Sequence, residues 1–233
     1  MADAPMTAHL VKLRPAPDLV DQVYRALLDA ISSGALAPGD RLTQEDIAER
    51  LAVSRQPVLQ ALRLLKRDGL VQDAPGRGLL VTPLDPAWIA QVYEVRGALD
   101  ALAARLAAER RAVLDARLVE QGRRAARGRN IEAMIEADMA FHNALYAASG
   151  NPLIAQSAQL HWVHLRRVMG AVLQQARQRE ALWDEHEAIA AAIARGDSEA
   201  AVGLVDRHGR QASQNLLARL HDVLDTRLQK GMS

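Results

Sequence analysis

The stretch TQEDIAERLAVSRQPVLQALRLLKRDG, residues 43–69, decides the fold of the N-terminal part of this chain. It predicts two short helices separated by an Ala-Val link. Thr43 and the acidic residues behind it favour the start of the first helix, because a hydroxyl group and negative charge both stabilise a helix N-terminus. Ser54 can cap the second helix, Pro57 is tolerated in its first turn, and Gly69 ends it.

The flanking segments complete a small domain. Residues 18–33 place apolar side chains at helical spacing and predict an amphipathic helix. LAPGDRL predicts a turn that leads into a short extended piece, and after Gly69 the segments LVQDA and LLVTP predict two strands joined by a tight loop. Three helices and a hairpin are the layout of a winged helix-turn-helix, in which the second helix of the turn pair enters the major groove of DNA. We therefore predict a DNA-binding domain over residues 18–83, preceded by a flexible arm at residues 1–17.

The C-terminal part is predicted to be entirely helical. Pro83 and Pro86 mark its boundary, and its predicted helices are 86–109, 111–127, 131–148, 152–176, 178–195 and 198–228. The short connections between them favour a compact antiparallel bundle. We predict a mainly α protein, with an all-helical domain over residues 84–228 and a C-terminal tail at residues 229–233.

The composition restricts the function classes. The chain of 233 residues has 49% hydrophobic and 24% charged residues, which is ordinary for a soluble globular protein. Its net charge of +1 means that any basic surface must be local, and the absence of cysteine excludes disulfides and thiolate chemistry. Neither a signal peptide nor an apolar stretch approaching the length of a membrane span is present. We expect a cytoplasmic protein without a membrane partner.

Polar side chains interrupt three apolar helix stripes in the C-terminal half. Asp138 and His142 lie one turn apart on one stripe, and His186 and His208 interrupt two others. A buried carboxylate costs on the order of several kcal/mol unless something compensates it. Taken singly, these residues indicate an Asp–His ion pair and satisfied core histidines, but together they form a ligand set for a divalent transition metal. We predict that the metal is zinc, with manganese, nickel and iron as alternatives.

An arginine interrupts the apolar stripe of the first bundle helix. Arg96 cannot lose its charge, so it needs an anion, which is either a protein carboxylate or an acidic ligand. A metal with an open coordination position and one arginine would together bind a small carboxylate. Arg166 is a second candidate for this role. We therefore predict a small organic-acid effector that contacts Arg96 and Arg166.

Residues 34–71 resemble the DNA-binding domain of GntR-type bacterial transcription regulators. The helical half, with DMAFH at residues 138–142 followed by His186 and His208, resembles the FCD-type ligand-binding domain of the fatty-acid-regulator branch. Such domains often hold a metal through one Asp and three His in this order. The resemblance covers about residues 18–228. The matching residues of the DNA-binding motif are Pro38, Gly39, Leu42, Ala48, Ser54, Arg55, Pro57, Val58, Ala61 and Leu62.

The resemblance implies a homodimer that binds a palindromic operator in double-stranded DNA. Binding of a small organic acid then releases the operator or changes how the dimer binds it. Arg55 matches the family arginine that contacts a guanine edge. Arg77, between Gly76 and Gly78, would be the wing contact to the minor groove or to phosphates. The expected DNA contacts are Arg41, Thr43, Arg55, Gln56, Gln60, Arg77 and Gly78.

The recognition helix departs from the family pattern at three positions. Gln56 replaces the usual Thr, Leu59 the usual Arg and Gln60 the usual Glu. Residues 18–83 also hold eight Lys and Arg against nine Asp and Glu, so the domain is not basic. We expect an altered operator sequence and a modest affinity. An alternative is a winged domain that is kept only as a protein-contact module.

We expect a metabolite-responsive regulator that acts as a repressor and is not an enzyme. Two alternatives stay open. One is a metal-dependent enzyme acting on a small carboxylate, because a metal with an open site activates water. Against it, no second carboxylate is obviously placed as a base, although Glu185 and Glu187 flank His186. The other is a metal-sensing repressor in which the ion itself is the signal.

Overall fold

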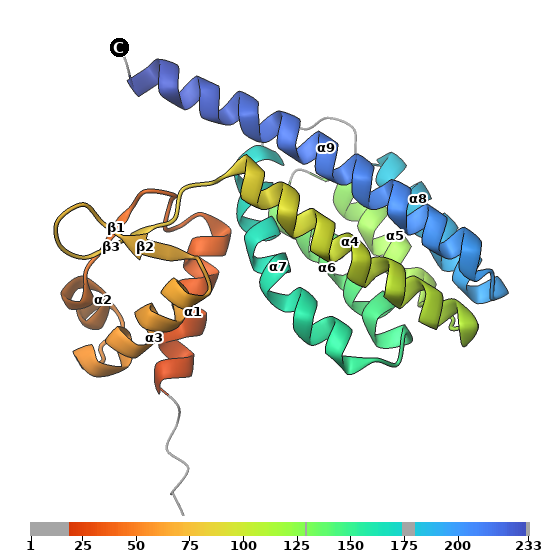
Figure 1. The fold of residues 1–233 in the computed structure, drawn as a ribbon, viewed down its shortest axis with the longest axis horizontal. Coiled ribbons are helices and arrows are strands. Elements are labelled where there is room, and N and C mark those ends of the chain that lie inside the picture. The colour runs from red at the N-terminus through yellow and green to blue at the C-terminus, as the bar shows by residue number, and fades with distance from the viewer. Residues whose placement is uncertain (1–18, 129, 174–179, 232–233) are drawn as a thin grey trace, which may run out of the picture.

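The computed structural model describes residues 19–128, 130–173 and 180–231, and it has two parts joined by the segment between β3 and α4 (Figure 1). The predicted arm at residues 1–17 lies outside the described residues. The N-terminal part consists of α1 (Leu19–Ser33), β1 (Arg41–Leu42), α2 (Gln44–Arg50), α3 (Arg55–Arg67), β2 (Val71–Asp73) and β3 (Leu79–Val81). The predicted winged helix-turn-helix is confirmed.

The residues predicted to begin and end the N-terminal helices largely do so in the structure. The Thr43 hydroxyl accepts a hydrogen bond from the backbone N–H of Asp46 and caps α2. Ser54 occupies the N-cap position of α3, but its side chain makes no cap hydrogen bond. Gly69 adopts a φ of +73°, a left-handed conformation that suits glycine and ends the helix.

The wing is the hairpin formed by β2, β3 and the loop between them. It is part of a three-stranded antiparallel sheet in the order β1-β3-β2. The predicted hairpin pairs Val71 with Val81, and the short extended piece adds a third strand by pairing Leu42 with Leu79. Beneath the sheet, α1 packs on α3 around a core of Val23, Leu27, Ile31, Leu42, Ile47, Ala48, Val58, Ala61, Leu62, Leu65, Leu70, Val71 and Val81.

The C-terminal part is the predicted helical bundle. Its helices are α4 (Pro86–Glu109), α5 (Ala116–Arg127), α6 (Ile131–Ala148), α7 (Pro152–Val172), α8 (Glu180–Arg195) and α9 (Ser198–Gly231). Side chains of Asp85, Asn130 and Asn151 cap α4, α6 and α7. α9 has 34 residues and lies along α4, and its C-terminal end extends past the bundle (Figure 1). None of the described helices is both long and apolar enough to cross a membrane.

Two predicted helix boundaries differ from the structure, and a third lies outside the described residues. The helix predicted from residue 111 begins at Ala116, because Arg111 adopts a φ of +49° that ends the preceding turn and Asp115 caps a new helix. The helix predicted to residue 176 is described to Val172, and residues 174–179 lie outside the described part. The predicted tail is helical as far as Gly231, since α9 continues without a break.

Hydrogen bonds join α7 of the bundle to the DNA-binding part. Nε2 of His164 lies 3.2 Å from the backbone oxygen of Asp68, and Nη2 of Arg167 donates to the backbone oxygen of Thr82 at 2.5 Å. Tyr24 of α1 donates to the Asp68 carboxylate at 2.8 Å. We name the contacts of His164 and Arg167 with these two oxygens the joint. His164 is buried here, although no pattern in the sequence distinguishes it from an ordinary histidine.

Candidate metal centre

The four predicted metal ligands converge in the middle of the bundle. Asp138 and His142 come from one face of α6, His186 from α8 and His208 from α9. All four side chains are buried, and one ligand atom from each lies within 4.8 Å of the others. Nε2 of His186 is 3.3 Å from Nε2 of His208 and 3.5 Å from Oδ1 of Asp138. The arrangement can hold a metal ion.

The chemistry of these residues fits a divalent transition metal. Among the described residues, Oδ1 of Asp138 and Nδ1 of His186 have no hydrogen-bond partner although both atoms are buried. A buried carboxylate oxygen without a partner is costly, and a cation compensates it. Burial lowers the pKa of His142, and it lowers the pKa of His186 well below the usual value. Both rings are therefore neutral at physiological pH, and neutral imidazole is the form that binds metals.

A carboxylate outside the predicted set orients one of these histidines. Nδ1 of His208 lies 2.8 Å from Oε2 of Glu185, so the ring N–H donates to the carboxylate and Nε2 is left facing the cluster. The sequence placed Glu185 only as a neighbour of His186. Its partner comes from another helix, which sequence spacing does not reveal.

Arg96 lies beside the cluster and already has a protein carboxylate. Its Nε donates to Oδ2 of Asp100 at 3.0 Å, and its Nη2 lies 2.9 Å from Nε2 of His142. Burial opposes ionisation of Asp100, but the positive charge of Arg96 holds the pKa of that carboxyl below its usual range. Tyr146 donates to Oδ1 of the same carboxylate at 2.5 Å. The protein-carboxylate alternative for Arg96 is thus realised within α4, and neither Asp100 nor Tyr146 was predicted from the sequence.

A pocket of about 340 Å³ opens beside the cluster, which is the size expected for a small-molecule site. Asp138, His208, Glu185 and Arg96 line one part of it. The apolar part of its wall is formed by Met134, Met169, Leu173, Leu182, Trp183 and Leu216. Gln211, Asn215 and Arg219 of α9 contribute further polar groups. The pocket therefore combines candidate metal ligands with an apolar wall.

The structure does not bring Arg166 to this pocket. Its guanidinium pairs with Glu132 at 3.2 Å and lies 3.9 Å from Asp29 of α1. Arg166 is therefore placed near the contact between α7 and α1, away from the residues that line the pocket.

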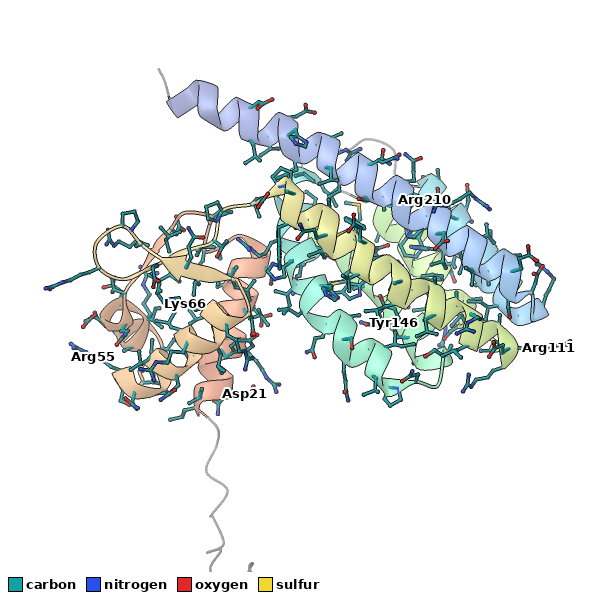
Figure 2. The ribbon with its side chains drawn as sticks, viewed as in Figure 1. Asp21, Arg55, Lys66, Arg111, Tyr146 and Arg210 are labelled. Atoms are coloured by element: carbon teal, nitrogen blue, oxygen red, sulfur yellow. The ribbon has the colours of Figure 1, made fainter. Side chains whose placement is uncertain are left out.

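The expected DNA-contacting residues lie at the other end of the molecule. Arg55 begins α3 at the outer rim of the N-terminal part, whereas Tyr146 lies inside the bundle (Figure 2). Arg55 is exposed and pairs with Glu45 of α2 at 2.9 Å. Gln56 is exposed and Gln60 partly buried on the same helix.

The wing is braced by Arg41. Its Nη2 donates to the backbone oxygens of Pro75 and Arg77, so this guanidinium holds the loop that carries Arg77. Thr43, Arg77 and Gly78 line one groove between the wing and α2. The expected contacts are therefore gathered on the wing and the helix pair.

Comparison with known proteins agrees with both parts of the fold. Residues 19–81 match the bacterial regulatory proteins, gntR family, and residues 91–211 match the FCD domain. The chain is 32% identical over 180 residues to an HTH-type transcriptional regulator in an unstable DNA locus of Streptomyces ambofaciens, which covers 75% of each protein. It is 26% identical to the HTH-type transcriptional repressor RspR of Escherichia coli K12, over 88% of this chain and 92% of RspR. Its fold is similar to that of E. coli McbR/YncC, with a TM-score of 0.72 and 23% identity over 90% of this chain and 99% of that one.

Proposed function

Because this chain belongs to the GntR family and carries an FCD domain, it is a DNA-binding transcription regulator and not an enzyme, and we propose that it is a repressor controlled by a small organic acid. The observation that carries the proposal is the buried cluster of one Asp and three His, of which Asp138 and His208 line a pocket. The description of RspR as a repressor supports the direction of the response. The alternative of a metal-dependent enzyme has no support from these relatives.

We propose that Asp138, His142, His186 and His208 hold a zinc ion, or manganese, nickel or iron in its place. Imidazole and carboxylate ligands suit all of these metals. When bound, the ion supplies a Lewis-acidic position for one carboxylate of the effector. Arg96 supplies a fixed positive charge next to that position, with its Nε held by Asp100 and its Nη2 2.9 Å from Nε2 of His142. Arg166, which lies outside the pocket, has no part in this proposal.

The proposed DNA contacts follow from the family and the placement of the N-terminal residues. Arg55 reads a guanine from the N-terminal end of α3, supported by Gln56 and Gln60. Arg77 and Gly78 contact the backbone or minor groove through the wing, with Arg41 bracing that loop and Thr43 beside it. The pairing of Arg55 with Glu45 has to open when the arginine turns to a base.

We propose that the protein acts as a homodimer on a palindromic operator. Its two recognition helices would then enter half-sites about 34–36 Å apart, one turn of DNA. An effector can change this spacing only through a difference in its affinity for the two dimer geometries. The joint provides the connection, since α7 packs on the bundle core and is hydrogen-bonded to the ends of α3 and β3.

The test is fluorescence-anisotropy titration of the zinc-loaded protein on labelled DNA from upstream of its own coding region, with a random duplex as reference. We expect salt-dependent binding that Arg55→Ala weakens, while Arg117→Ala, which removes an exposed arginine of the bundle, leaves it unchanged. Small organic acids should then lower the affinity for the operator.

Two results would contradict the proposal. Equal affinity for upstream and random DNA would mean that the protein recognises no operator sequence upstream of its own coding region. A change in DNA affinity on adding zinc alone, with no further effect of any acid, would instead identify the ion as the signal and make the protein a metal-sensing repressor.

A further inference from the structure

The pocket beside the cluster has a second cationic residue that the proposed function does not use. Arg219 of α9 lines the pocket and is partly buried. In the part of the chain that the structure describes, no carboxylate pairs with it. Arg96, the other arginine that lines this pocket, pairs with Asp100 instead. A partly buried guanidinium beside a cavity is an anion site, because arginine keeps its charge.

The register of α9 places Arg219 well away from the metal cluster. His208 and Arg219 are eleven residues apart, which is close to three helical turns and roughly 16 Å along the axis. They therefore lie on the same face of the helix, and both line the pocket. Because helical side chains lean towards the N-terminus, the arginine reaches back in the direction of the cluster and shortens this span.

The wall between these two ends is largely apolar. On α9 itself, Ala212 and Leu216 lie between His208 and Arg219, and Met169 and Leu182 contribute from α7 and α8. Gln211 donates to Asn215 at 3.1 Å, so part of the polar capacity of these two amides is already used within the helix. A ligand that fills the pocket therefore meets a positive centre, an apolar stretch and a second positive centre.

We propose that the effector is an extended acid with two anionic groups separated by an apolar chain. One carboxylate lies at the cluster beside Arg96, and the second anionic group lies at Arg219. This inference rests on the proposed acid-binding role of the pocket and adds the class of acid. Arg219 is then a specificity-determining residue, since an acid with one charged end would leave its guanidinium without a partner.

The experiment compares acids of equal chain length on the zinc-loaded full-length protein by isothermal titration calorimetry. Hexanoate, octanoate and decanoate are paired with adipate, suberate and sebacate. For the wild type we expect the best diacid to bind roughly ten- to a hundredfold more tightly than its matched monoacid, the usual gain from a charge-assisted hydrogen bond. Arg219→Gln should remove this preference while leaving monoacid affinity unchanged.

The matched control is Arg210→Gln, which removes an exposed α9 arginine that lines a different pocket between α4 and α9 (Figure 2). This variant should keep the wild-type preference for diacids. Equal binding of matched monoacids and diacids, or a preference that survives Arg219→Gln, would overturn the inference alone. If neither series binds, the acid-binding role of the pocket fails as well, and the two failures are thereby distinguished.

Discussion

Nδ1 of His208 on α9 donates a hydrogen bond to Oε2 of Glu185 on α8 across 2.8 Å, and this contact fixes which nitrogen of the ring faces the metal cluster. Replacing Glu185 by Gln keeps the volume but removes the charge that orients the ring. We expect Glu185→Gln to weaken zinc binding by about 10–100-fold, the usual effect of losing such a partner. Competition with a chromophoric chelator measures the zinc affinity.

The control for this change lies on the same helix. Glu187 pairs with Arg123 at the surface, so Glu187→Gln removes an equal charge without touching the cluster. Zinc affinities that fall equally in both variants would show that the loss of a negative charge on α8, and not the loss of the bond to His208, is responsible.

Asp138→Asn should affect the melting temperature differently in the metal-free protein and in the zinc-loaded protein. Oδ1 of Asp138 is buried and, within the described chain, accepts no hydrogen bond, so neutralising the group relieves an unpaired buried charge. In the metal-free protein we expect the variant to unfold at the same or a higher temperature than the wild type. Zinc should raise the melting temperature of the wild type but not of Asp138→Asn, because binding only to the folded state stabilises it. A variant that is less stable than the wild type in excess chelator would contradict this account.

Gly122 gives a test of packing around the cluster. A Cβ at this position would lie 2.0 Å from the ring of Trp183, which is buried and has its ring centroid 4.7 Å from that of His186. Gly122→Ala should therefore cost about 1–3 kcal/mol of unfolding free energy and also weaken zinc binding, as Trp183 is pushed against His186.

The contrasting substitution is Gly97→Ala in α4, where an added Cβ meets nothing within 4 Å. This change should be neutral or stabilise the protein by up to about 1 kcal/mol, because alanine is the better helix former. Urea unfolding measures both free energies. A Gly122→Ala protein as stable as Gly97→Ala would mean that Trp183 has room to move.

His164 makes stability depend on pH. Burial, and then the positive charge of Arg167, lower the pKa of His164 to about 4. The unfolded chain binds the proton near pH 6.5, so the stability that His164 contributes is complete above that pH and is lost as the pH falls towards about 4. Between about pH 7 and pH 5 the loss should be on the order of 2 kcal/mol.

His164→Gln can still donate to the backbone oxygen of Asp68 but does not titrate, so its unfolding free energy should fall less over this range. Other buried histidines, including His142 and His186, also make the unfolding free energy fall with falling pH. Their contribution is the same in the wild type and in His164→Gln, so it cancels when the two proteins are compared. The exposed His221→Gln should behave as the wild type does. Parallel pH profiles for wild type and His164→Gln would refute the assignment.

Local patterns were enough to predict the winged helix-turn-helix and the position of the bundle helices. Turn residues such as Gly69 and cap residues such as Thr43 act within a few residues of themselves, so their signals can be read directly. The break before α5 was missed because it depends on a left-handed Arg111, and a non-glycine residue in that conformation has no mark in the sequence.

The four candidate ligands were predictable because polar residues interrupted apolar stripes. Their supporting partners were not, since Tyr146 reaches Asp100 from another helix and Glu185 reaches His208 in the same way. Both contacts depend on how the helices pack against each other, and a single sequence does not specify the distance between two packed helices. Arg166 was predicted from its residue type and helix alone, and in the structure it pairs with Glu132 of α6 and lies 3.9 Å from Asp29 of α1.

The joint between the two parts is made to backbone atoms. His164 and Arg167 meet the carbonyl oxygens of Asp68 and Thr82, which any amino acid at those positions would present. The bundle can therefore stay attached while the recognition helix changes its side chains, including those at Gln56, Leu59 and Gln60. Such an attachment leaves the exposed side chains of the recognition helix open to change without cost to the two hydrogen bonds that connect it to the sensing half.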